Sequence, residues 1–428
     1  MDNQKHADAV PAAHQPDLDQ DGVDRRGFLK CMAWAGTGLV WTLSGGIPVS
    51  RAFAGNGDRG AGKAADFTFV QISDSHIGFD KPANPDVTAT LQLAINKINA
   101  LPQAPDFVIH TGDLTHLSKP SEFDTLDHML RGAAAKQTYF VPGEHDMLSD
   151  NGGQYLERFG KNTKGSGWYS FDHKGVHFVG LVNVANLKAG GMGALGPEQL
   201  DWLEADLKGL TTSTAIVLFA HIPLWTVYPE WGWGTDDSEQ ALSYVRRFGS
   251  VTVLNGHIHQ IMQKVEGKLS FHTAMSTAFP QPAPGTAASA GPMKVPAEQL
   301  RRVLGLTEVN YRVSGSSLAI VDSPLEASQA SVPGNQSTSS AAEAASTEEI
   351  KIDNFSFTPG VIKVKTGALV TWVNRDDMPH TVDSATGKFK SATLDTDDKF
   401  QFRFTDAGEY SYYCRIHPRM TGNVVVQA

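Results

Sequence analysis

Five short motifs in the first two thirds of the chain carry residues that bind metal ions well. In chain order they are Asp74-Ser75-His76, Gly112-Asp113, Gly143-Glu144-His145-Asp146, His221 and Gly256-His257-Ile258-His259. Carboxylates and imidazoles are good ligands for transition metals, and two cations about 3.5–4 Å apart neutralise anionic oxygens and ionise a bound water. Such a pair suits the hydrolysis of a phosphate ester. A single Asp-x-His or Gly-Asp more often marks a cap or a turn, so the inference rests on the whole ordered set.

A second group of candidate ligands lies near the C-terminus. Cys414, His417 and Met420 share one short stretch, and His380 precedes them far upstream. A soft thiolate, two imidazoles and a weak thioether are the ligands of a type 1 copper centre, which has to serve both oxidation states of copper. We therefore expect one copper ion here. Two alternatives stay open: a sandwich without copper in which Cys414 is buried, and a zinc site.

The elements that position the first group follow an α/β rhythm. Continuous apolar runs, typical of strands buried on both faces, alternate with apolar residues at helical spacing and each run ends in polar residues. The runs cover residues 67–72, 107–109, 139–141, 215–220 and 251–254, and the helical patterns include Leu91, Ile95 and Ile98, then Phe123, Leu126 and Leu130, then Leu200, Leu203 and Leu207. Because α/β enzymes place their chemistry at strand ends, the motifs fall where an active site is expected. Residues 279–300, rich in Pro, Ala and Gly, form either a loop or a lid near it.

The composition divides the chain into segments. Residues 323–348 consist mostly of Ala, Ser, Thr, Gly, Gln and Glu and contain no aromatic residue, which predicts a flexible linker. Residues 349–428 then alternate apolar and polar side chains, which predicts a small β-sandwich. We expect a removable N-terminal segment (1–54), a short leader (55–65), an α/β domain (66–322), the linker and the sandwich.

The order and spacing of the five motifs resemble the calcineurin-like metallophosphoesterase superfamily, in particular its cyclic-nucleotide phosphodiesterase-like branch. The stretches Gly112-Asp113-Leu114-Thr115 and Trp202-Leu203-Glu204 also look like that branch. The resemblance implies a four-layer α-β-β-α sandwich and two divalent or trivalent transition metals, Fe, Mn or Zn. It also implies hydrolysis of a phosphate mono- or diester by metal-activated hydroxide.

The same resemblance assigns a role to each motif position. One metal would be held by Asp74, His76, Asp113 and His259, and the other by Asp113, Glu144, His221 and His257, so that Asp113 bridges the two. His145 would stay off the metals and donate a proton or hydrogen bond to the leaving oxygen, while Asp146 would orient its ring.

One position departs from the family pattern, which usually has Asn where this chain has Glu144. The longer, charged side chain still coordinates and should bind cations more tightly, but its charge weakens the pull on substrate oxygens. An inactive pseudoenzyme is therefore the alternative to a working hydrolase.

The C-terminal sandwich resembles the plastocyanin and amicyanin group of cupredoxins, an all-β Greek-key fold. The Cys-x-x-His-x-x-Met loop, Met378-Pro379-His380 and Tyr412-Tyr413 look closest to amicyanin. The resemblance implies electron transfer and a redox partner protein.

The N-terminal segment resembles a twin-arginine export signal. Arg25-Arg26-Gly27-Phe28-Leu29-Lys30 precedes an apolar stretch interrupted by glycines, and Ala52-Phe53-Ala54 offers a cleavage pattern. We expect cleavage after Ala54 and delivery by the twin-arginine export machinery to the periplasm or the exterior. An uncleaved membrane anchor is the alternative.

Charge and cysteine content limit the remaining possibilities. The net charge is −10, which argues against a nucleic-acid partner and leaves bound metals as the source of positive charge for an anionic substrate. Of the two cysteines, Cys31 falls in the removable segment, so a disulfide framework is excluded. His110, His116, His272 and the cluster of Trp225, Trp231 and Trp233 have no motif role and are assigned to packing; for the tryptophans, the lining of a substrate cleft is the alternative.

Two functions follow from these patterns. The first is an exported phosphoesterase with an appended copper domain, and the second is a copper-binding electron-transfer protein whose phosphoesterase domain is weak or inactive. The motifs do not name the substrate's alcohol, although export argues against cyclic nucleotides.

Overall fold

A computed structural model describes residues 38–44, 47–53, 67–312, 317–326 and 348–428. The predicted twin-arginine motif at Arg25-Arg26, the cleavage position after Ala54 and the leader lie outside the described residues. Two strands that pair with each other, β1 (Gly38–Ser44) and β2 (Ile47–Phe53), occupy part of the predicted signal. In the described part of the chain, helices are too short or too polar to cross a membrane.

The α/β domain contains two sheets. The first has the strand order β13-β12-β3-β4-β5, and the second has the order β10-β11-β9-β8-β7-β6. The strands of the first sheet are β3 (Phe67–Ile72), β4 (Phe107–His110), β5 (Thr138–Phe140), β12 (Gly305–Arg312) and β13 (Ser317–Pro324). Those of the second are β6 (Tyr169–His173), β7 (Val176–Gly180), β8 (Ala215–Ala220), β9 (Val251–Asn255), β10 (Gln263–Glu266) and β11 (Leu269–Thr273).

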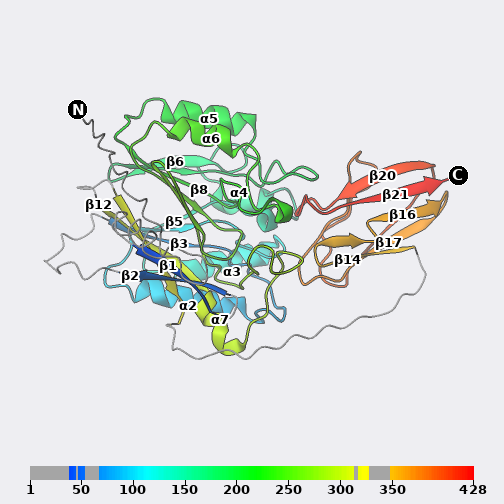
Figure 1. The fold of residues 1–428 in the computed structure, drawn as a ribbon, viewed down its shortest axis with the longest axis horizontal. Helices are drawn as coiled ribbons and strands as arrows, with labels where there is room; N and C mark the ends of the chain where they lie inside the picture. Colours follow the sequence, from blue (N-terminus) through cyan, green and yellow to red (C-terminus); the bar gives the residue numbers. More distant parts are fainter. Residues whose placement is uncertain (1–37, 45–46, 54–66, 313–316, 327–347) are drawn as a thin grey trace, which may run out of the picture. The chain divides into compact units, whose positions relative to one another are not determined.

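Helices cover the outer face of each sheet, as Figure 1 shows for α5 and α6 on one side and α2 and α3 on the other. The helical segments are α2 (Val87–Asn99), α3 (Pro120–Leu130), η1 (Glu144–Met147), α4 (Gly153–Phe159), α5 (Pro197–Leu207), η2 (Pro229–Trp231), α6 (Ser238–Val245) and α7 (Ala297–Val303). On β3, Phe69 faces the aromatic core between the sheets while Val70 packs toward α2 and α3. Strands buried on both faces explain the continuous apolar runs, and the predicted four-layer α-β-β-α fold is confirmed.

The C-terminal domain is a sandwich of two four-stranded sheets, β15-β14-β17-β19 and β16-β21-β20-β18. Its strands are β14 (Glu349–Asp353), β15 (Ser356–Thr358), β16 (Val361–Lys365), β17 (Leu369–Asn374), β18 (Asp383–Ser384), β19 (Lys399–Arg403), β20 (Gly408–Tyr413) and β21 (Thr421–Gln427). Trp372 lies fully buried in the core between the sheets. The predicted cupredoxin fold is confirmed.

The α/β domain ends later than the composition suggested. Ser323 and Pro324, assigned to the linker, pair in β13 with Leu306 and Gly305, and the Leu325 amide donates to the carbonyl of Leu304. Backbone pairing holds these residues in the sheet although their side chains are small or polar. Residues 327–347, the rest of the predicted linker, lie outside the described part.

Candidate metal centres

The first candidate metal cluster combines loops that follow β3 and β9. His76 Nε2 lies 3.3 Å from His259 Nε2, which lies 3.4 Å from Asp74 Oδ1. Asp113, after β4, completes the group, with its Oδ2 3.5 Å from His76 Nε2. All four side chains are buried. The predicted residues of one metal shell therefore converge on one point.

The second cluster shares Asp113 with the first. His221 Nε2 lies 3.3 Å from Asp113 Oδ2 and 3.0 Å from Glu144 Oε2. The other oxygen of Glu144 lies 2.9 Å from His257 Nδ1. One carboxylate oxygen of Asp113 thus faces both groups, which is the arrangement a bridging ligand requires.

The backbone of these loops is unusual. Asp74, His76, Asp113, His257 and His259 all have positive φ, between 40° and 71°. This left-handed region is sparsely populated by residues other than glycine and costs roughly 1–3 kcal/mol per residue. Strain of this kind gathers at functional sites, where it aims side chains in directions that a relaxed strand end would not give.

Two glycines of the motifs allow the loops to approach each other. A Cβ on Gly143 would lie 2.0 Å from Asp113 Oδ1, and one on Gly256 would lie 2.0 Å from Ser73 Oγ. Both distances are far inside van der Waals contact. Glycine in Gly-Glu-His-Asp and Gly-His-Ile-His is therefore a packing requirement of the site.

Several contacts show that the residues fit metal ions. The buried His221 Nε2 and Glu144 Oε2 lie 3.0 Å apart, yet neither makes a hydrogen bond of normal geometry to the described residues, as buried polar groups usually do. His221 Nδ1 contacts the Thr111 carbonyl at 2.7 Å, and His259 Nδ1 contacts the Phe279 carbonyl at 2.6 Å. These contacts turn each Nε2 toward the cluster, in the way that a carbonyl bonded to the other ring nitrogen orients a metal-binding histidine.

The charges of the carboxylates also favour bound cations. Burial alone would raise the pKa of Asp74, but His259 and His221 outweigh it and lower the pKa to about 2. Burial also works to raise the pKa of Glu144, yet His257 and His221 bring it well below its usual value. Buried carboxylates that stay ionised need positive partners.

The structure contradicts the role predicted for Asp146, which was to orient the His145 ring. The His145 Nδ1 contacts the backbone carbonyl of His116 at 2.8 Å, so this carbonyl, and not Asp146, orients the ring. Asp146 instead accepts hydrogen bonds from the amides of Gly143, Leu114 and Thr115 and from the Thr115 hydroxyl. The hydrogen bonds of its carboxylate all go to the two motif loops, so Asp146 does not orient the His145 ring.

The copper-type ligands also come together. Cys414 Sγ lies 3.7 Å from both His380 Nδ1 and His417 Nδ1, which are 3.2 Å apart. Bonds of about 2.0–2.3 Å in a trigonal set imply donor separations of roughly 3.5–4 Å, close to these values. Met420 is buried on the same loop. The three donors therefore fit one ion.

Neighbouring polar groups hold this second centre in shape. His380 Nε2 contacts Asp376 Oδ2 at 2.7 Å, and the Thr381 amide donates to Cys414 Sγ at 3.4 Å. Burial raises the pKa of the Cys414 thiol, but His380 outweighs it and the net shift is downward. Asn374 donates to the carbonyls of Met378 and Leu394 and so fixes the loop that carries His380. Residues of the sandwich thus hold these ligands in place.

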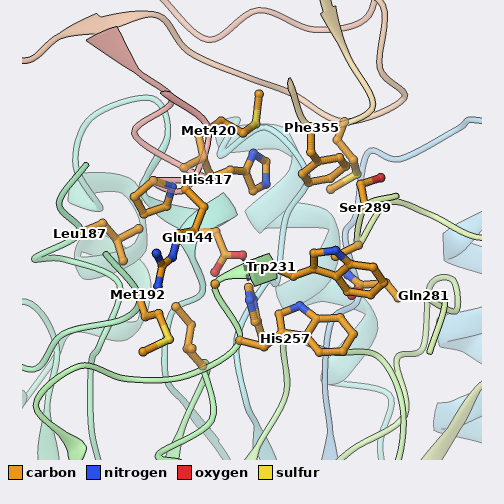
Figure 2. Close-up of a pocket in the computed structure, with 18 of the residues that line it drawn as sticks. Glu144, Leu187, Met192, Trp231, His257, Gln281, Ser289, Phe355, His417 and Met420 are labelled. Atoms are coloured by element: carbon orange, nitrogen blue, oxygen red, sulfur yellow. Dashed lines mark ion pairs between the residues drawn. The ribbon is translucent and has the colours of Figure 1, made fainter. Parts of the chain in front are cut away.

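One cavity of about 270 Å³ faces the first centre and the copper-type loop together. In Figure 2, His417, Met420 and Phe355 lie along one side of it, opposite His257. Glu144 and His145 line it, as do Gln281 and Ser289 from the 279–300 segment. That segment is a loop over residues 279–296 followed by α7, and part of it forms a wall of the site.

Several residues assigned to packing lie in or next to the site. Trp231 and Trp233 line the cavity, whereas Trp225 packs against Phe271. His116 is buried beside His145, with ring centroids 5.4 Å apart. In the sequence, only the position of His116 three residues after Asp113 pointed to this. His110 contacts Ser75 Oγ, and His272 contacts Asp322, which are structural roles.

The fold and the two clusters define a metallophosphoesterase domain joined to a β-sandwich of the cupredoxin type. Comparison with known families agrees: residues 67–261 match the calcineurin-like phosphoesterase family and residues 331–426 match the cupredoxin-like domain. The chain belongs to both families, one in each domain, and its phosphoesterase domain makes it a phosphoric ester hydrolase. These families imply divalent metals and copper respectively.

Known proteins are similar either to the cupredoxin domain or to the phosphoesterase domain. Amicyanin of Paracoccus denitrificans is 33% identical over 24% of this chain and 81% of its own length. A 3',5'-cyclic-nucleotide phosphodiesterase of Nostoc sp. is 26% identical over 50% of this chain and 79% of its own length. A serine/threonine-protein phosphatase of Danio rerio is 28% identical over 45% of this chain and 70% of its own length.

Proposed function

We propose that the chain hydrolyses a small phosphate mono- or diester at a dinuclear centre and that its cupredoxin domain binds one copper for electron transfer. The observation that carries the hydrolytic proposal is the position of Asp113 Oδ2 between the two groups of ligands, 3.5 Å from His76 Nε2 and 3.3 Å from His221 Nε2. A cavity of about 270 Å³ favours a small substrate.

Two metals fit the ligands in the following way. Asp74, His76 and His259 would hold one ion, Glu144, His221 and His257 would hold the other, and both would share Asp113. Nitrogen and oxygen donors without thiolate suit Fe, Mn or Zn. When bound, such a pair neutralises the ester's oxygens and makes water a nucleophile at neutral pH.

The protein's own residues orient the ester and protonate its leaving group. His145 Nδ1 is held by the His116 carbonyl, which leaves Nε2 free at the cavity. From there it donates a proton or hydrogen bond to the leaving oxygen. The Asp113 Oδ1 accepts from the His145 amide at 3.0 Å, so the bridging carboxylate and the catalytic histidine are positioned together.

At the second centre, Cys414, His380, His417 and Met420 hold copper. The Asp376 contact and the Thr381 amide stabilise one ligand geometry for both oxidation states, which favours rapid electron transfer. A separate redox protein would exchange the electron.

We also propose export through the twin-arginine route to the periplasm or exterior, supported by the Arg25-Arg26 motif and the pattern at Ala54. Mass spectrometry of the secreted protein should find an N-terminus after Ala54. An intact Met1 in secreted protein would contradict cleavage.

Paired variants test the two activities. His145→Ala should lower hydrolysis of aryl phosphate mono- and diesters at least about 100-fold, because a general acid contributes roughly 10²–10⁴-fold. It should leave the visible absorption of the Cu(II) protein intact. Cys414→Ser should remove that absorption and spare hydrolysis.

Other outcomes separate the two candidate functions. A wild-type protein that is blue but inert after reconstitution with Mn, Fe or Zn would indicate the copper-binding protein with an inactive phosphoesterase domain. If the protein hydrolyses esters but stays colourless with Cu(II), the proposal of a copper centre is contradicted instead.

A further inference from the structure

The copper loop, residues 414–420, makes hydrogen bonds to the phosphoesterase domain. The Gly190 amide donates to the carbonyl of Pro418. Arg415 donates from Nη1 to Asn151 Oδ1 at 3.3 Å and from Nη2 to the Leu148 carbonyl at 3.4 Å. The loop that carries three of the four copper-type ligands is thus also the loop that contacts the other domain.

Apolar side chains cross between the domains in both directions. Leu148, just after η1, is buried in the core cluster of the sandwich. Met378 of the sandwich is buried in the cluster formed around α2 and α3, and Phe355 packs against the same cluster. These buried contacts hold the copper loop against the cavity that contains the candidate dinuclear centre.

The cavity between them has a shared wall. Phe355, Ile416, His417, Arg419 and Met420 line it from the sandwich. The rings of His417 and His145 have centroids 6.2 Å apart. A substrate whose leaving oxygen reaches His145 must therefore lie next to the copper loop.

The wall that the sandwich contributes carries one positively charged side chain, Arg419. Among the residues that line the cavity, Arg419 is the only Arg or Lys, whereas Asp113, Glu144 and Glu230 are acidic. Arg419 makes no ion pair with any of the described residues and is exposed. Its Cγ would lie 3.7 Å from a Cβ placed on Gly232, so its stem runs along the loop of Trp231. A guanidinium in this position is available to an anion.

We propose that the copper loop is one wall of the substrate pocket and that Arg419 binds the anionic oxygens of the phosphate ester there. This rests on the proposed function, which it extends by assigning a substrate-binding residue to the cupredoxin domain. Because Arg419 lies between His417 and Met420, an anion held by it also changes the surroundings of the copper.

The test uses the full chain with both centres loaded and orthophosphate as the probe. Calorimetric titration should give a phosphate affinity about ten-fold weaker in Arg419→Gln than in wild type, as expected for one charge-assisted contact. Arg419→Lys should recover part of the loss. The matched control Arg403→Gln, on the exposed face of β19, should bind as wild type does.

A second readout follows the copper. Saturating orthophosphate should shift the visible absorption or the electron paramagnetic resonance spectrum of the Cu(II) protein, with the same midpoint as the calorimetric titration. The Arg419→Gln protein should need about ten-fold more phosphate for this shift.

The failures are distinguishable. Phosphate that binds wild type and Arg419→Gln equally, or that binds without any change at copper, would overturn this inference and leave the hydrolytic proposal standing. If phosphate does not bind the loaded wild-type protein, both this inference and the hydrolytic proposal are contradicted.

Discussion

At the scale of single residues, the site uses backbone groups where the sequence suggested side chains. His145 is held by the carbonyl of His116, and Asp146 ties the loops of Gly112-Asp113 and Gly143-Glu144 together through four hydrogen bonds. In the proposed mechanism His145 acts on the leaving oxygen, whereas the hydrogen bonds of Asp146 hold two loops of the site together.

This division predicts different effects for the two positions. Asp146→Asn replaces one of two carboxylate oxygens, each of which accepts two hydrogen bonds, by an NH₂ group, so two donors lose their acceptor. We expect a loss of about 2 kcal/mol of stability and a fall in Tm of roughly 4–8 °C. Calorimetric melting measures this, with Val265→Ala, at a side chain that is 75% exposed, as the control that should melt near wild type. An Asp146→Asn protein with unchanged Tm but abolished hydrolysis would instead assign Asp146 to catalysis.

At the scale of elements, strand ends bring the ligands together and short helices pack over the sheets. His177 on β7 shows how such elements are joined outside the site, because it contacts Asp172 on β6 at 2.8 Å and Asp206 on α5 at 2.8 Å. Burial lowers the pKa of His177, but the two carboxylates outweigh it and the net shift is upward.

The upward shift predicts how stability depends on pH. A group with a raised folded pKa stabilises the fold fully below its unfolded pKa of about 6.5 and loses this effect as the pH rises through the folded pKa. His177→Gln should therefore lower Tm more at pH 5.5 than at pH 9, by comparison with wild type at the same pH. Equal losses at the two pH values would show that the ion pairs contribute nothing.

At the scale of the whole chain, the cupredoxin domain is part of the phosphoesterase site. Leu148 is buried in the sandwich core, and Met378 is buried in the phosphoesterase core. Apolar surface exchanged in this way stabilises the association of the two domains by burial.

Disrupting this exchange should separate the domains. Leu148→Asp places a charge in the sandwich core cluster, which costs several kcal/mol unless the domains part. We expect a larger radius of gyration by small-angle X-ray scattering and two resolved melting transitions. The control Val265→Asp, at a side chain that is 75% exposed on β10, should change neither. A Leu148→Asp protein with wild-type dimensions would contradict the docked arrangement.

The sequence by itself determined the domain types and the ligands, because metal chemistry restricts the residue types and strand ends fix their order along the chain. The apolar runs gave β3, β8 and β9 closely, and period two gave the sandwich. The end of the α/β domain was placed too early because backbone pairing, which composition does not record, holds Ser323 and Pro324 in the sheet.

Only the tertiary structure decided which atoms meet. The role of the His116 carbonyl, the left-handed backbone at Asp74 and His257, and the copper loop beside His145 all depend on contacts between segments far apart in the chain. Spacing along the sequence carries local periodicity and motif order, whereas the contact between His417 and His145 spans 272 positions (417 minus 145) and arises from packing between two domains.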